Sequence, residues 1–229
     1  MRYVSAILVA LITVLGTAAC NKVSEDNLNK WMNTERGPDR IVEALVDGTM
    51  EPNLRAVAAR NLIRMDRWAT VKEALDDTPT DARLPLIKAL SLKLWEDARI
   101  KDKMQVPTSV QTNAKDALYE LRQYTDDAGR EVIDGYLVEW LTGYYEGRAR
   151  TGRVGGHIIV RAIGARASDG LLSQARSIVA APPDKDGNYL LIGDSLLYGL
   201  ALSGSVDAVG FILDLAASPS KDKTCLLYT

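Results

Sequence analysis

Residues 52–76, PNLRAVAARNLIRMDRWATVKEALD, contain two apolar helical stripes separated by a short polar turn. The first stripe has the spacing of one helix face and consists of Leu54, Val57, Ala58, Leu62 and Met65. Pro52 stands in the first helical turn, where proline is tolerated. The second stripe follows residues 65–67 and consists of Trp68, Val71, Ala74 and Leu75. This stretch predicts two consecutive helices joined by a tight turn.

The same layout recurs twice near the end of the chain, over residues 158–180 and 191–217, with turns near 167–169 and at 203–205. Longer helices are expected between the first pair and the other two, over residues 84–98, 108–124 and 126–146. No segment alternates apolar and polar residues cleanly over many positions, so strand signals are scarce. The sequence therefore predicts an all-α fold with repeated helix pairs.

Short helix pairs whose first helix is rich in small residues resemble HEAT repeats, and residues 56–62, AVAARNL, are the closest local match. The resemblance covers about a third of the chain and implies a short right-handed superhelix of antiparallel helix pairs, an α-solenoid. Pairs similar to tetratricopeptide repeats are the alternative, although the aromatic pattern of that family is missing.

The first nineteen residues have the features of an export signal: a positive start at Arg2, an uncharged stretch from Tyr3 to Leu15, and small residues up to Ala19. The apolar stretch is too short to span a bilayer, which takes about 20 residues. The sequence around Ala18-Ala19-Cys20 resembles the end of a bacterial lipoprotein signal, which implies that Cys20 is acylated. That pattern prefers leucine where this chain has Thr17, so ordinary signal-peptidase cleavage after Ala19 is the alternative.

The lipoprotein resemblance implies a lipid-anchored protein of the bacterial envelope. Asn21 is not the aspartate that retains some lipoproteins in the inner membrane, which favours the outer membrane, facing the periplasm. We expect a signal peptide over 1–19, an anchor and linker over 20–36, a helical-repeat domain over 37–217 and a tail over 218–229. Because the last helix pair is apolar nearly all round, either the sequence is truncated in the tail or a partner covers that pair.

Composition excludes several kinds of partner. Among 229 residues, 28 basic and 30 acidic side chains give a net charge of −2, so no positive field attracts nucleic acid. One histidine and two cysteines are too few for a Cys/His zinc site. We expect no cofactor and no metal.

Residues 147–168 contain no acid but several basic side chains, among them Arg148, Arg150, Arg153 and His157. Glycines precede an expected helix start near residue 156, and helix starts favour anions. These four residues are the candidate site for a partner or an anion. The alternative is that the arginines are solvated or paired with acids of neighbouring helices.

Tyr136, Trp140 and Tyr144 recur every four residues on the longest expected helix. They predict an aromatic strip that grips a peptide or a glycan, with core packing between helices as the alternative. An envelope hydrolase acting on glycans through Glu139 or Glu146 beside this strip is a second function class, and a binding module for small apolar molecules is a third. The favoured hypothesis is a non-catalytic scaffold for protein–protein interaction, whose partners are envelope proteins, because the sequence holds no catalytic motif.

Overall fold

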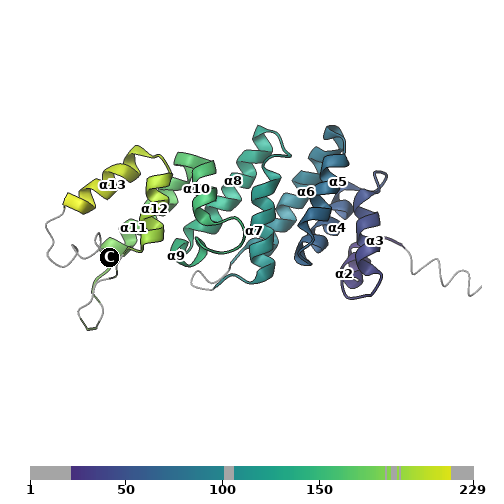
Figure 1. Ribbon diagram of the computed structural model, residues 1–229, viewed down its shortest axis with the longest axis horizontal. Coiled ribbons are helices and arrows are strands. Elements are labelled where there is room, and N and C mark those ends of the chain that lie inside the picture. Colours follow the sequence, from purple (N-terminus) through teal and green to yellow (C-terminus); the bar gives the residue numbers. More distant parts are fainter. Residues whose placement is uncertain (1–21, 101–105, 184, 187–189, 191, 218–229) are drawn as a thin grey trace, which may run out of the picture. The chain divides into compact units, whose positions relative to one another are not determined.

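The computed structural model describes residues 22–100, 106–183, 185–186, 190 and 192–217 (Figure 1). Within these residues every regular element is a helix, which confirms the all-α prediction. The chain divides into two compact units, residues 1–90 and 91–229, and the boundary falls inside helix α6 (Thr80–Ala98). The signal segment, Cys20 and the 218–229 tail lie outside the described residues.

The first unit is built around the helix pair of the 52–76 stretch. Its helices before α6 are α2 (Glu25–Trp31), α3 (Gly37–Val46), α4 (Pro52–Arg64) and α5 (Trp68–Asp77), and α4 contacts the other three. The turn between α4 and α5 reverses at Asp66, whose φ is +60°. The Arg67 N–H donates to the Leu62 carbonyl at 2.8 Å, which closes α4 with a Schellman motif. This pair forms as the sequence predicts.

Helix α4 lies in the interior of the first unit, because every residue from Arg55 to Ile63 is buried. Arg55 remains satisfied there: its Nε donates to the Leu45 carbonyl at 2.7 Å and its Nη2 to Thr78 Oγ1 at 3.2 Å. Burial lowers the pKa of Arg55. Arg55 therefore joins α4 to the ends of α3 and α5.

The expected linker over residues 20–36 is partly helical. Helix α2 buries Leu28 completely and contacts α3 and α4, so it belongs to the packed unit. Ser24 caps the helix by accepting from the Asn27 N–H at 3.3 Å. A seven-residue helix with one core side chain shows no periodic stripe, which explains why apolar spacing does not predict it.

The second unit contains the rest of the helices. They are α7 (Ser109–Leu121), α8 (Asp127–Thr142), α9 (Tyr145–Arg148), α10 (Gly156–Ile163), the 3-10 helix η1 (Gly164–Ala167), α11 (Ser168–Ala180), α12 (Asp194–Leu202) and α13 (Val206–Ala217). Helix α11 contacts both α12 and α13, and α10 contacts α12 (Figure 1). None of the helices in the described part of the chain is both long and apolar enough to cross a bilayer.

Several predicted helix boundaries are wrong. The turn expected near residues 167–169 comes earlier, because α10 ends at Ile163 and α11 already begins at Ser168. The helix expected over 126–146 ends at Thr142, and α9 begins at Tyr145. The Gln174 side chain of α11 compensates at this break: its Oε1 accepts from the Tyr145 N–H at 3.0 Å and its Nε2 donates to the Thr142 carbonyl at 3.0 Å. The helix expected from residue 84 already begins at Thr80 and accommodates Pro85 inside it. The break after Thr142 depends on a contact from a distant helix, and the early start of α6 depends on the accommodation of Pro85. Local sequence shows neither.

Candidate functional site

The turn that follows α9 is held by a buried ion pair on α7. Lys115 is fully buried, and its Nζ donates to Asp116 Oδ1 at 2.5 Å, to the Thr151 carbonyl at 2.9 Å and to the Val154 carbonyl. An ammonium group has three protons to donate, and all three have acceptors here. Burial lowers the pKa of Lys115, and the neighbouring Asp116 carboxylate opposes this shift.

Asp116 holds the same turn through two backbone N–H groups. Its Oδ2 accepts from the Arg153 N–H at 2.8 Å and its Oδ1 from the Val154 N–H at 3.2 Å. Gly152 lies between these anchor points with φ +78°, and a Cβ there would sit 2.7 Å from both carboxylate oxygens. The residues 151–154 are therefore fixed to α7 through one lysine, one aspartate and one glycine.

Arg148 lies in the interior, so the expectation that it faces a partner or an anion is corrected. It is 3% exposed, and its Nη1 donates to the Trp140 carbonyl. Its Cζ lies 5.8 Å from the centroid of the Trp140 ring. Gly143 makes room for the guanidinium, because a Cβ there would lie 2.4 Å from Arg148 Nη1. Burial lowers the pKa of Arg148.

The aromatic residues on α8 and after it do not form an accessible strip. Trp140 is 1% exposed, and the cationic groups of Lys115 and Arg148 lie 5.2 Å and 5.8 Å from the centroid of its ring. Tyr136 stacks on Trp95, with ring centroids 5.1 Å apart and an interplanar angle of 5°. Tyr144 is half-buried. A peptide or glycan cannot reach Trp140 in the core, so these aromatic residues pack between helices.

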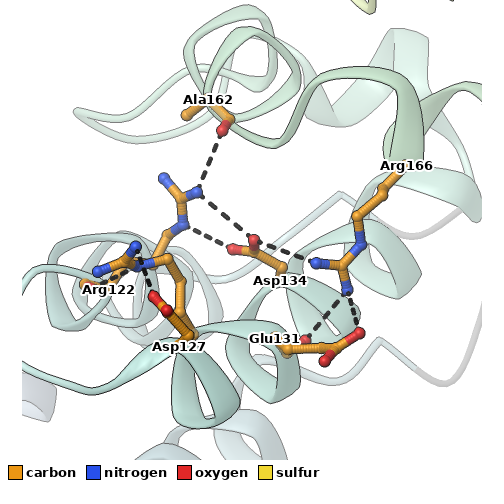
Figure 2. Close-up of polar contacts among 7 residues, drawn as sticks. Arg122, Asp127, Glu131, Asp134, Ala162 and Arg166 are labelled. Atoms are coloured by element: carbon orange, nitrogen blue, oxygen red, sulfur yellow. Dashed lines mark hydrogen bonds and ion pairs between the residues drawn. The ribbon is translucent and has the colours of Figure 1, made fainter.

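A second polar cluster joins α7, α8, α10 and η1 (Figure 2). Asp134 of α8 is nearly buried, and its Oδ1 accepts from Arg122 Nε at 2.6 Å. Arg122 Nη2 also donates to the Ala162 carbonyl at 3.1 Å. Arg166 of η1 pairs with Asp134 at 3.8 Å and with Glu131 at 3.5 Å. Arg166 belongs to the acid-free stretch 147–168, and it pairs with acids of a neighbouring helix.

A cavity of about 360 Å³ lies among α9, α10 and α12. The residues that line it are Tyr145, Ala149, Arg150, His157, Asp194, Ser195 and Tyr198. The His157 and Tyr198 rings lie 6.5 Å apart at an angle of 39°. Two of the four predicted site residues, Arg150 and His157, therefore meet here. Arg153 is exposed but does not line the cavity, and its Nε lies 4.0 Å from Asp116 Oδ2.

Within the described part of the chain, Arg150, His157, Asp194 and Ser195 form no side-chain hydrogen bond or ion pair. The Tyr145 hydroxyl is buried and has no partner among those residues. Burial raises the pKa of Tyr145 to about 12, with smaller contributions from Glu146 and Tyr198. Ser195, His157 and Asp194 line one cavity, but no hydrogen bond joins them into a proton relay.

The sequence predicts only some of the residues that line this cavity. Basic residues next to glycines led to Arg150 and His157, whereas Tyr145, Asp194 and Tyr198 were missed as partners because α12 is remote in sequence. Glu146, considered for hydrolysis, has a different environment: its Oε2 accepts from the Leu196 N–H at 3.2 Å. This contact caps the start of α12 from α9.

Comparison of the chain with protein-family models, with curated proteins and with solved structures finds no match. Across residues 22–100, 106–183, 185–186, 190 and 192–217, no group of three or more His, Cys, Asp or Glu side chains is placed to hold a metal ion.

Proposed function

We propose that the chain is a lipid-anchored bacterial envelope protein that acts as a non-catalytic scaffold for protein–protein interaction. Its helix pairs would stack as a short right-handed superhelix of the HEAT type, and its acylated Cys20 would hold it at the outer membrane, facing the periplasm. The observation that carries the scaffold role is an exposed apolar stripe on α13.

The stripe consists of Val206, Val209 and Leu213, which are 85%, 46% and 62% exposed. Their spacing of three and then four residues places them on one face of α13. Within the described residues, Ala208 is the one residue of α13 that is fully buried. Grouped exposed apolar side chains are typical of a surface that binds another protein.

An apolar helix of a partner protein fits this face best. Anchors at positions i, i+3 and i+7 are the pattern by which helices dock on each other. Gly210 lies within the stripe, and a Cβ built there would have no neighbour within 4 Å, so a partner backbone has space to approach closely. Asp207 and Asp214 are exposed on the same helix, so we expect basic residues beside the partner's apolar face.

A photo-crosslinking amino acid placed at Leu213 in living cells tests the docking face. We expect a discrete adduct heavier than the chain, and Val209→Glu should abolish it. The same probe at Asp127, whose side chain is fully exposed on α8, is the matched control and should give no adduct. An adduct of twice the chain's own mass would show self-association and refute the scaffold proposal, as would equal adducts at both positions or none.

The lipid anchor is tested separately by labelling cells with a fatty-acid analogue. Wild type should incorporate the label and sediment with membranes, and Cys20→Ala should lose both properties. Cys225→Ala replaces the other cysteine of the chain and should keep both. An unlabelled wild type, or label lost in the Cys225 variant instead, would refute acylation at Cys20. Anchoring raises the effective concentration of the scaffold near its envelope partners.

A further inference from the structure

The cavity among α9, α10 and α12 holds one cationic and one anionic side chain that do not neutralise each other. Arg150 and Asp194 both line it, both are exposed, and no ion pair joins them within 4.0 Å. Two other pairs of opposite charges in this unit do meet, namely Lys115 with Asp116 and Arg122 with Asp134. Opposite charges that face one cavity without meeting suit a ligand that carries both charges itself.

Tyr145 lines the cavity and carries a buried hydroxyl. Its side chain is 1% exposed, and its hydroxyl has no partner among the described residues. A buried hydroxyl without a partner costs free energy, so such groups are rare unless something else satisfies them. The ring is held tightly: a Cβ on Gly199 would lie 2.8 Å from the hydroxyl oxygen, and a Cβ on Gly156 would lie 3.1 Å from Cε2.

The cavity also offers apolar contact and a suitable size. The Tyr198 ring is 52% exposed and lies beside the His157 imidazole, so one wall is a planar, accessible surface. A volume of about 360 Å³ is at the small end of the range for ligand sites, which begins at about 300 Å³. A compact ligand with a small side chain matches these dimensions.

We propose that this cavity binds a zwitterionic ligand of the size of an amino acid or a short peptide. The ligand's carboxylate pairs with the Arg150 guanidinium, and its ammonium group pairs with the Asp194 carboxylate. This site lies on different helices from the docking stripe of α13. It extends the proposed scaffold by a small-molecule site and does not depend on it.

The chain's single histidine provides a direct reporter of binding. His157 lines the cavity, so ¹³C-labelled histidine gives one imidazole signal, which comes from the site itself. The full chain, without a histidine tag and in detergent micelles, is titrated with alanyl-alanine at constant pH. We expect a saturable shift of the signal. N-acetyl-alanyl-alanine amide, which lacks both charges, should bind at least about tenfold more weakly.

Variants assign each contact. Arg150→Gln and Asp194→Asn should each weaken alanyl-alanine binding by about tenfold, because each removes one charge-assisted hydrogen bond. Asp194→Asn should also abolish the preference for a free over an acetylated amino end. Arg161→Gln and Asp214→Asn change exposed charges outside the cavity and should leave the affinity unchanged.

Three results would overturn the proposal: no saturable shift with alanyl-alanine, equal affinity for the blocked peptide, or equal losses in the control variants. Binding of N,N′-diacetylchitobiose without binding of the peptide would also overturn it and would identify a saccharide site. None of these results affects the crosslink expected at Leu213, so failure here is distinguishable from failure of the scaffold proposal.

Discussion

Residues 148–157 contribute to two polar regions, a buried inner one and an outer one beside the cavity, which differ in how their charges are used. On the inner side, Lys115 and Asp116 are buried and engage the carbonyls and N–H groups of the turn. On the outer side, Arg150, His157 and Asp194 border a cavity, and their side chains form no hydrogen bond or ion pair with the described residues. Paired buried charge fixes the backbone, and unpaired charge beside a cavity is available to a ligand. Substitutions in each region test this difference.

The largest expected effect comes from breaking the inner region with Asp116→Ala. This change leaves the Lys115 ammonium buried without its counter-ion and removes the acceptor of the Arg153 and Val154 N–H groups. Breaking one partner of a buried ion pair costs about 3–5 kcal/mol. Urea unfolding followed by circular dichroism should show a loss of this size in the free energy of unfolding.

The matched control is Asp127→Ala. Asp127 forms an exposed i,i+3 pair with Arg130 at 3.4 Å, so the free energy of unfolding should change by less than about 0.5 kcal/mol. Similar losses in the two variants would contradict the view that the inner pair organises the turn.

Smaller effects are expected from two glycine substitutions, one in the turn and one in an ordinary helix. Gly152→Ala forces a side chain into φ +78° and against Asp116, which should cost about 1–3 kcal/mol. Gly135→Ala on α8 meets nothing within 4 Å and should gain about 0.5–1 kcal/mol from better helix propensity. Thermal or urea unfolding measures both. If Gly152→Ala were as stable as wild type, the turn would not require its left-handed backbone.

The sequence predicts the helix pairs well because their signal is local. Residues 52–76 carry apolar spacing, a favourable Pro52 and a polar turn, and together these place α4 and α5 to within a residue or two. The break between α8 and α9 was missed because a side chain from α11, Gln174, satisfies the backbone there. Contacts of that kind depend on tertiary packing and leave no periodic pattern.

Only about half of the candidate site could be predicted from the sequence, because tertiary packing decides which of its side chains meet. Arg148, Arg150 and Arg153 look equivalent in sequence, yet Arg148 is in the core and Arg150 borders the cavity. Lys115 and Asp116 carry no signal of burial, since charged residues beside an apolar stripe are usually solvated. Asp194 and Tyr198 are brought to the cavity by the packing of α12 on α9 and α10.

The smallest effect on stability is expected from Tyr145→Phe, which changes the outer region by a single oxygen. Because the hydroxyl has no partner among the described residues, its removal should leave the free energy of unfolding unchanged or raise it by up to about 1 kcal/mol at neutral pH. Tyr198→Phe, at an exposed phenol, is the matched control and should change it by less than about 0.5 kcal/mol. A loss above about 2 kcal/mol for Tyr145→Phe would show that the hydroxyl already has a partner within the protein.

The pH dependence of the same variant gives a second measurement. The pKa of Tyr145 is about 12 in the folded protein, against 10.0 for an unperturbed tyrosine, so between these values the folded state holds a proton that the unfolded state has released. Stability from this group is therefore present below about pH 10 and is lost as the pH rises from about 10 to 12. In Tyr145→Phe, urea unfolding should show a shallower decline over that range than in wild type. Identical declines would mean that the phenol is solvated in the folded protein.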